Sequence, residues 1–114
     1  MNYTPDKWVV VRMETDEQAI YKVFATTYGG YTNGDSWRLN SGISKVEDLG
    51  DYYNFHGYSG SVYSCPKVSY GTSSYTGNVL ADLINRMENI ASIQILPSHY
   101  DFTLLKDTHE RFNS

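Results

Sequence analysis

The chain has 114 residues, of which 40% are hydrophobic and 19% are charged, and its formal net charge is −4. This length and balance predict a single folded domain over residues 1–114 and argue against a disordered chain. The acidic balance, without a basic stripe, argues against a protein that binds duplex nucleic acid. The single cysteine, Cys65, excludes a disulfide framework within the chain and leaves too few thiols for a structural zinc site.

The first predicted element is an antiparallel hairpin. Residues 8–13 are rich in β-branched side chains, and residues 19–25 are typical of the returning strand. Between them Glu14, Asp16 and Glu17 form an acidic segment, which we expect at the solvated tip of the hairpin.

Four short strand candidates follow a glycine-rich loop. They cover residues 36–40, 43–47, 52–56 and 61–65, and only a few turn-forming residues separate each from the next. Links this short predict antiparallel neighbours, because a parallel connection needs a longer crossover. Together with the hairpin, the pattern predicts an antiparallel β-meander of about five to seven strands.

One amphipathic helix is predicted after the meander, over about residues 75–91. Its apolar residues recur at helical spacing and form one stripe: Val79, Leu80, Leu83, Ile84, Met87 and Ile90. Ser74 and Thr76 are the candidates for the N-cap. A meander with one apolar face needs such a cover, so we predict an α+β fold in which the sheet packs against this helix. Residues 92–97 are expected to add an edge strand, and the tail after about residue 98 to be partly ordered.

No apolar segment of the sequence approaches the roughly 20 residues that a membrane-spanning helix needs. Residues 1–7 also lack the apolar stretch of a secretory signal. From these observations we expect a protein that does not contact a membrane and that resides in a reducing cytoplasm.

No catalytic motif is recognisable. The chain lacks a phosphate loop, a dinucleotide fingerprint and a paired-histidine zinc helix. The spacing around His56, His99 and His109 does not bring three metal ligands to one face, and Cys65 is more typical of a buried strand residue than of a nucleophile. We therefore expect no metal and no cofactor, and a non-catalytic protein is favoured over a small enzyme.

The high aromatic content, with 11 Tyr, 4 Phe and 2 Trp, favours a surface that stacks on a flat ligand. Arginine binds phosphates through paired hydrogen bonds, and an amide can read a base edge. Nine aromatic, basic and amide side chains are the candidates for a ligand site: Trp8, Arg12, Lys22, Tyr31, Trp37, Arg38, Asn40, Tyr63 and Lys67. The alternative for each is a place in the core or on the solvated surface.

Three segments resemble small accessory proteins of tailed phages: residues 3–10 (YTPDKWVV), 36–43 (SWRLNSGI) and 60–65 (GSVYSC). The size and layout of the chain are similar to those of Thoeris anti-defence proteins. This resemblance implies a viral protein that sequesters a nucleotide immune signal in an aromatic and basic pocket and assembles as a homo-oligomer.

We expect the ligand to be nucleotide-like, either a cyclic nucleotide or a derivative of ADP-ribose. The main alternative is a protein that binds and inhibits a host enzyme, because exposed tyrosines are enriched at protein interfaces. A structural component of the virion is a further alternative.

Overall fold

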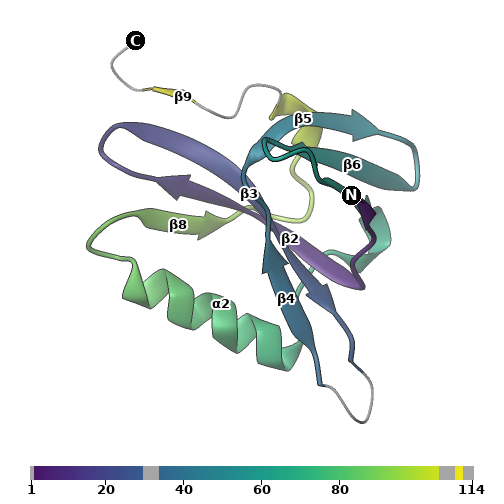
Figure 1. Cartoon of the computed structure of the whole chain (residues 1–114), viewed down its shortest axis with the longest axis horizontal. Coiled ribbons are helices and arrows are strands. Elements are labelled where there is room, and N and C mark those ends of the chain that lie inside the picture. Colours follow the sequence, from purple (N-terminus) through teal and green to yellow (C-terminus); the bar gives the residue numbers. More distant parts are fainter. Residues whose placement is uncertain (1, 30–33, 106–109, 112–114) are drawn as a thin grey trace.

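The computed structural model of the chain describes residues 2–29, 34–105 and 110–111. Its fold is α+β, as the sequence predicted, with two sheets and one α-helix in these residues (Figure 1). The strands and helices are β1 (Asn2–Tyr3), β2 (Lys7–Glu14), β3 (Gln18–Thr27), β4 (Ser36–Leu39), β5 (Ile43–Asp48), β6 (Tyr52–Gly57), β7 (Val62–Pro66), the 3₁₀ turn η1 (Lys67–Ser69), α2 (Ser74–Arg86), β8 (Ser92–Ile95), the 3₁₀ turn η2 (Phe102–Leu104) and β9 (Glu110–Arg111).

The larger sheet has five strands, in the order β4-β3-β2-β8, with β9 also paired to β3. The β2–β3 hairpin is antiparallel, as predicted, and Val10 lies opposite Val23. The backbone N–H of Thr15 donates to the carbonyl of Gln18 at 2.9 Å and closes its polar tip. β8 lies antiparallel to β2 as the expected edge strand.

The smaller sheet has four strands, in the order β1-β7-β6-β5. Its β5–β6–β7 part is the predicted antiparallel meander. β1, however, runs parallel to β7, with Asn2 opposite Val62. The spacing of neighbouring strands does not indicate this pairing, because it joins segments from distant parts of the chain.

The chain passes from the larger sheet to the smaller one at Asn40–Gly42. The backbone N–H of Asn40 donates to the carbonyl of Val23 at 3.0 Å, which holds the end of β4 against β3. Gly42 then adopts a φ of 129°, and a Cβ at this position would lie 2.8 Å from the Ile20 side chain. The positive φ favours glycine at this turn between β4 and β5. The predicted meander therefore divides into two sheets after β4.

Two apolar clusters cover the two faces of the larger sheet. The cluster towards the smaller sheet contains Trp8, Val10, Val23, Ala25, Ile43, Phe55, Tyr63, Cys65, Phe102 and Leu105. The cluster towards α2 contains Val9, Val11, Phe24, Leu80 and Ile93. Successive residues of β2 alternate between the clusters, as a strand covered on both faces requires.

α2 begins one residue earlier than predicted and ends five residues sooner. Ser73 is the N-cap: its hydroxyl accepts from the N–H of Thr76, and the Thr76 hydroxyl accepts from the N–H of Ser73. After Arg86 the chain turns back so that β8 can pair with β2. Ile90, predicted on the apolar stripe, is 70% exposed in this turn.

The tail beyond β8 contributes to the core. Phe102 and Leu105 are buried, whereas Leu104 is exposed. In the described residues, no helix is both long enough and apolar enough to cross a membrane.

Candidate functional site

A pocket of about 300 Å³ lies where β1, β4 and β7 meet the turns around Ser41 and Ser59. This volume is at the lower end of the range for small-ligand sites. Its lining residues are Tyr3, Arg38, Leu39, Asn40, Ser41, Ser59, Ser61 and Tyr63. We call it the Arg38 pocket. It brings together Arg38, Asn40 and Tyr63 from the predicted set.

Arg38 supplies the positive charge of this pocket. Its guanidinium carbon lies 4.2 Å from the centre of the Tyr3 ring, and its N–H donates to the Tyr3 hydroxyl at 3.2 Å. Within the part of the chain that the structure describes, Arg38 forms no ion pair with a carboxylate. A neighbouring hollow of about 340 Å³ shares Tyr3 and Arg38, so the guanidinium stands between two cavities. Its charge is therefore placed to meet an anion.

Tyr63 forms the buried wall of the pocket. It is 4% exposed, and its ring centre lies 5.2 Å from that of Tyr3. Burial raises the pKa of the Tyr63 hydroxyl, while the nearby charge of Arg38 acts in the opposite direction. The net shift is upward, so the hydroxyl keeps its proton at neutral pH.

Asn40 is held in one orientation by the backbone. Its Oδ1 accepts from the N–H of Val23 at 2.9 Å and from the N–H of Gly42 at 3.3 Å. The side chain is buried, and its Nδ2 has no hydrogen-bond acceptor among the described residues. Unpaired buried donors are rare in folded proteins, so this amide is unusual.

Two serines join the turns that border the pocket. The Ser41 hydroxyl donates to the Ser59 hydroxyl at 3.2 Å and accepts from the backbone N–H of Ser59 at 2.9 Å. Behind them, a Cβ on Gly57 would lie 3.1 Å from the Ser41 hydroxyl and 3.6 Å from Asn40 Nδ2. The pocket thus offers a cation and hydroxyl groups, which suit a polar anionic ligand.

Trp37 neighbours Arg38 on β4 but lies on the opposite face of the sheet. Its ring stacks on Phe24, with centres 5.5 Å apart and planes inclined by 18°. The side chain is 41% exposed. Successive strand residues point to opposite faces, so Trp37 does not share the pocket with Arg38.

Trp8 lies in the core. It is 1% exposed, and its indole N–H donates to the carbonyl of Pro66 at 2.7 Å. Its ring contacts four other aromatic rings, those of Tyr53, Phe55, Tyr70 and Phe102. These contacts give Trp8 a structural role between the two sheets.

The remaining predicted candidates lie away from the Arg38 pocket. Arg12 pairs with Glu14, and the hydrogen bond that Arg12 donates to this carboxylate raises the pKa of Arg12. Lys22 is half-buried on β3, opposite Val11 of β2. Tyr31 lies outside the described residues.

Lys67 pairs with Asp48 at 2.7 Å and lies 4.7 Å from the centre of the Tyr53 ring. The hydrogen bond between Lys67 and Asp48 raises the pKa of the lysine and lowers the pKa of the carboxyl. Lys67 is thus already neutralised by a carboxylate, in contrast to Arg38.

Sequence reasoning missed five residues of the pocket: Tyr3, Leu39, Ser41, Ser59 and Ser61. The serines occur in turn segments, where serine is common for local reasons. Tyr3 reaches the pocket through the parallel pairing of β1 with β7. A motif search had no signal for these residues, because they come from three separate segments.

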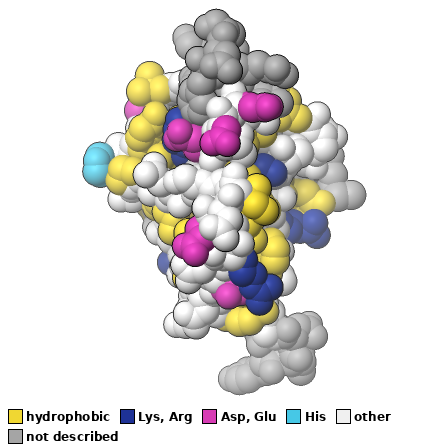
Figure 2. Space-filling view, turned by 90° about the vertical axis from the view of Figure 1, so that its left-hand side faces the viewer, with side chains coloured by type: hydrophobic (Ala, Val, Ile, Leu, Met, Phe, Trp, Pro, Cys, Tyr) yellow, Lys and Arg dark blue, Asp and Glu magenta, His cyan; other side chains and the backbone are white. Residues whose placement is uncertain are grey.

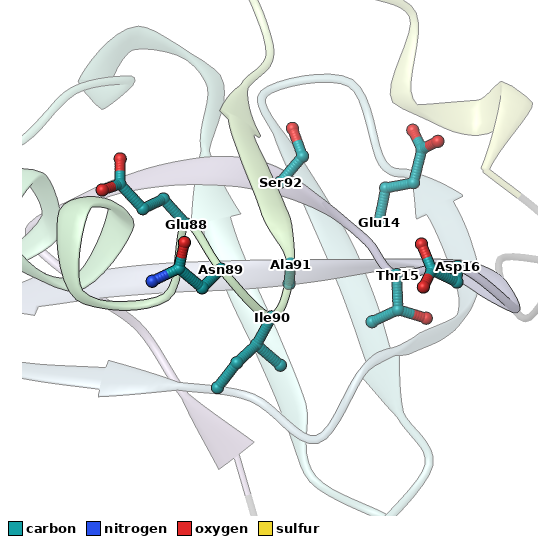
Figure 3. Close-up of a pocket in the computed structure, with 8 residues that line it drawn as sticks. All are labelled: Glu14, Thr15, Asp16, Glu88, Asn89, Ile90, Ala91 and Ser92. Atoms are coloured by element: carbon teal, nitrogen blue, oxygen red, sulfur yellow. The ribbon is translucent and has the colours of Figure 1, made fainter.

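A second pocket of about 300 Å³ lies between the β2–β3 hairpin tip and the loop from α2 to β8 (Figure 3). Glu14 and Asp16 line it from the hairpin, and Glu88 lines it from the loop. Acidic side chains also appear in the space-filling view of this end of the molecule (Figure 2). Over the described ranges, no cluster of three or more His, Cys, Asp or Glu residues is arranged to hold a metal ion.

The nucleophile and base candidates are separated. Cys65 is fully buried, and this burial raises the pKa of its thiol. His56 Nε2 lies 2.5 Å from Glu47 Oε1 on the smaller sheet, and this hydrogen bond lowers the pKa of Glu47. His99 is exposed, and His109 falls outside the described residues.

Comparison of the chain with protein-family models, curated proteins and solved structures found no match.

Proposed function

We propose that the protein binds a small nucleotide-like anion in the Arg38 pocket and acts without catalysis. The observation that carries this proposal is the Arg38 guanidinium, which lies over Tyr3 at 4.2 Å and beside a pocket of about 300 Å³. Arginine binds a phosphate group through parallel charge-assisted hydrogen bonds. Hydroxyl groups of Ser41, Ser59 and Ser61 border the same space and add polar contacts for a sugar or a phosphate.

In this proposal the protein is viral and counters host defence by sequestering a cyclic nucleotide or ADP-ribose-derived signal in the host cytoplasm. This role is the one that the resemblance to Thoeris anti-defence proteins implies, and it includes assembly as a homo-oligomer. Sequestration requires tight binding and slow release, but no nucleophile or general base.

Isothermal titration calorimetry against mononucleotides, cyclic nucleotides and ADP-ribose derivatives tests the proposal. We expect at least one nucleotide to bind, and Arg38→Gln to weaken its binding by roughly tenfold or more. Arg12→Gln is the matched control, because it removes the same charge at a distant site and should leave the affinity unchanged. Absence of binding across the panel, or equal loss in both variants, would contradict the proposal.

The second candidate function is binding to a host protein. Three large aromatic side chains, Tyr28, Trp37 and Tyr75, are 50%, 41% and 55% exposed. The segments that carry them are joined, because Thr26 pairs with Trp37 in the sheet and the Thr26 hydroxyl bonds to that of Thr76 at 2.7 Å. The start of α2 accordingly lies beside β4 (Figure 1).

Exposed aromatic groups of this kind are enriched at protein interfaces. A pull-down from host lysate should then recover one stoichiometric partner, and the double variant Trp37→Ala/Tyr75→Ala should lose it. Retention of that partner by the double variant would argue against this interface.

A further inference from the structure

A second cavity lies next to the Arg38 pocket along β4. It is the neighbouring hollow of about 340 Å³, which shares Tyr3 and Arg38 with the pocket and is also lined by Ser36 of β4 and by Thr4, the residue after β1. We call it the Ser36 hollow. The Arg38 pocket extends the other way along the chain, from Arg38 to Ser41. The two cavities therefore lie on either side of the Arg38 side chain.

The Ser36 hollow and the guanidinium are on the same face of the larger sheet. Ser36 and Arg38 are two positions apart on β4, so their side chains point to one face. They lie opposite Thr27 and Ala25 of β3, and these two residues also line the hollow. Ser36, Arg38 and Thr27 are exposed. A ligand can therefore reach both the hollow and the guanidinium from solvent.

The charge of the two cavities describes the anion that fits them. Arg38 is the one charged side chain among the described residues that line either cavity. A guanidinium has five N–H donors, and the Tyr3 hydroxyl accepts from one of them at 3.2 Å. The others can bind the two free oxygens of a phosphodiester, which carries a single negative charge. A terminal phosphate carries about −1.5 to −2 at neutral pH, which one guanidinium does not neutralise.

The size of the two cavities favours the same kind of ligand. Each is near the lower limit of about 300 Å³ for small-ligand sites, and together they provide about twice that space. A ligand that fills both extends past Arg38 on two sides, so its anionic group lies between two neutral parts. Two nucleosides joined by a phosphodiester have this layout. Ser59 and Ser61 line one cavity and Thr4 and Ser36 the other, so hydroxyl-bearing side chains are available to both sugars.

We propose that the protein binds a dinucleotide, with the phosphodiester on Arg38 and one nucleoside in each cavity. This inference rests on the proposed function and narrows its ligand to two nucleosides joined through one phosphate. The same unit occurs as a free dinucleotide and as a step within a single strand of RNA or DNA. The net charge of −4 disfavours a long anionic strand, so the ligand is the free dinucleotide.

Calorimetric titration with UpU, ApA, UMP and AMP tests the inference. We expect at least one dinucleotide to bind about tenfold more tightly than the mononucleotide of the same base, because its second nucleoside occupies the other cavity. A strand of six nucleotides of that base distinguishes the source of the ligand. It should bind no more tightly than its number of dinucleotide steps explains. Much tighter binding would contradict the free dinucleotide and assign the site to a single strand.

Ser36→Tyr fills one cavity and leaves Arg38 in place. It should lower the affinity for the dinucleotide to that for the mononucleotide, whose own affinity should stay within about twofold. Ser92→Tyr is the matched control, because both serines are exposed and begin an edge strand of the larger sheet. Ser92 lies on β8 and lines neither cavity, so the control should bind the dinucleotide like the wild-type protein. Urea unfolding establishes that both variants are folded.

The outcomes distinguish this inference from the proposed function. If no nucleotide of either kind binds the wild-type protein, both fail. If mononucleotides bind through Arg38 and dinucleotides bind no more tightly, only the two-cavity inference is overturned, and this comparison does not depend on a variant. Equal affinities of Ser36→Tyr and Ser92→Tyr for the dinucleotide would overturn it as well.

Discussion

The two faces of the larger sheet are built from different side chains. The face towards the smaller sheet is aromatic, with Trp8 at its centre and ring centres 4.7–6.1 Å away on four neighbours. The face towards α2 is mainly aliphatic, and Phe24 is the one aromatic member among its buried residues in the described chain. In Figure 1 the helix lies below the larger sheet and the smaller sheet lies above it.

The comparison shows where the unusual aromatic content goes. Much of it fills the space between the two sheets, and the candidate ligand site forms at the margin of that aromatic layer, where Tyr3 and Tyr63 meet Arg38. Trp37 and Arg38 are adjacent in the sequence but serve different faces. A cluster of aromatic and basic residues along a chain therefore does not by itself define a common site.

The largest expected effect is a loss of stability, and it compares how much each face of the larger sheet contributes to the free energy of unfolding. Trp8→Ala should lower the free energy of unfolding by about 4 kcal/mol, because it removes the central ring of the aromatic layer. Leu80→Ala on α2 should lower it by about 3 kcal/mol. Urea denaturation of both variants measures the difference. A larger loss for Leu80→Ala would show that the helix-covered face contributes more to stability.

Tyr70 tests how the two faces are connected, because it packs against both clusters. Its hydroxyl donates to the carbonyl of Leu96 at 2.6 Å and accepts from the N–H of Val10 at 3.1 Å. Tyr70→Phe should lower the free energy of unfolding by about 1–3 kcal/mol, since it leaves these groups unpaired. The control Tyr75→Phe, at an exposed position, should change it by less than about 0.5 kcal/mol. Equal effects would contradict the structural role of the Tyr70 hydroxyl.

Trp37→Ala tests whether the helix-side face of the larger sheet takes part in nucleotide binding. We expect a loss of about 1 kcal/mol in stability from the missing stack on Phe24. Because Trp37 lies on the helix side, nucleotide affinity should stay within about twofold of the wild-type value. Calorimetric titration of the variant measures this affinity. A tenfold loss would place Trp37 at the ligand and contradict the separation of the two faces.

The smallest expected effect is the dependence of folding stability on pH. Burial raises the pKa of Tyr63 and of Tyr70 above the value in the unfolded chain. The folded state therefore holds these protons more tightly, and the associated stability is complete below about pH 10. It is lost as the pH rises from there through the pKa of the folded state.

Urea midpoints between about pH 8 and 11 should therefore fall towards the alkaline end. The fall should be less steep in Tyr63→Phe and in Tyr70→Phe. A wild-type slope in both variants would mean that these two hydroxyl groups do not cause the effect.

The local pattern of side chains determined the elements of this protein. A run rich in β-branched residues predicts the β2–β3 hairpin, closely spaced strand candidates predict the β5–β6–β7 meander, and an apolar stripe predicts α2. These signals are local, because strand and helix periodicities extend over neighbouring residues. The sequence also favoured a buried strand position for Cys65. It placed the acidic residues Glu14, Asp16 and Glu17 at the hairpin tip.

Tertiary structure alone decided how the elements pair and which side chains meet. β1 joins β7 in parallel, and the strands divide into two sheets at Asn40–Gly42. The Arg38 pocket depends on both events, since Arg38 bonds to Tyr3 at a separation of 35 residues and Asn40 to Val23 at a separation of 17 residues. Contacts over such distances are set by register and topology, which the periodicity of a single segment does not specify.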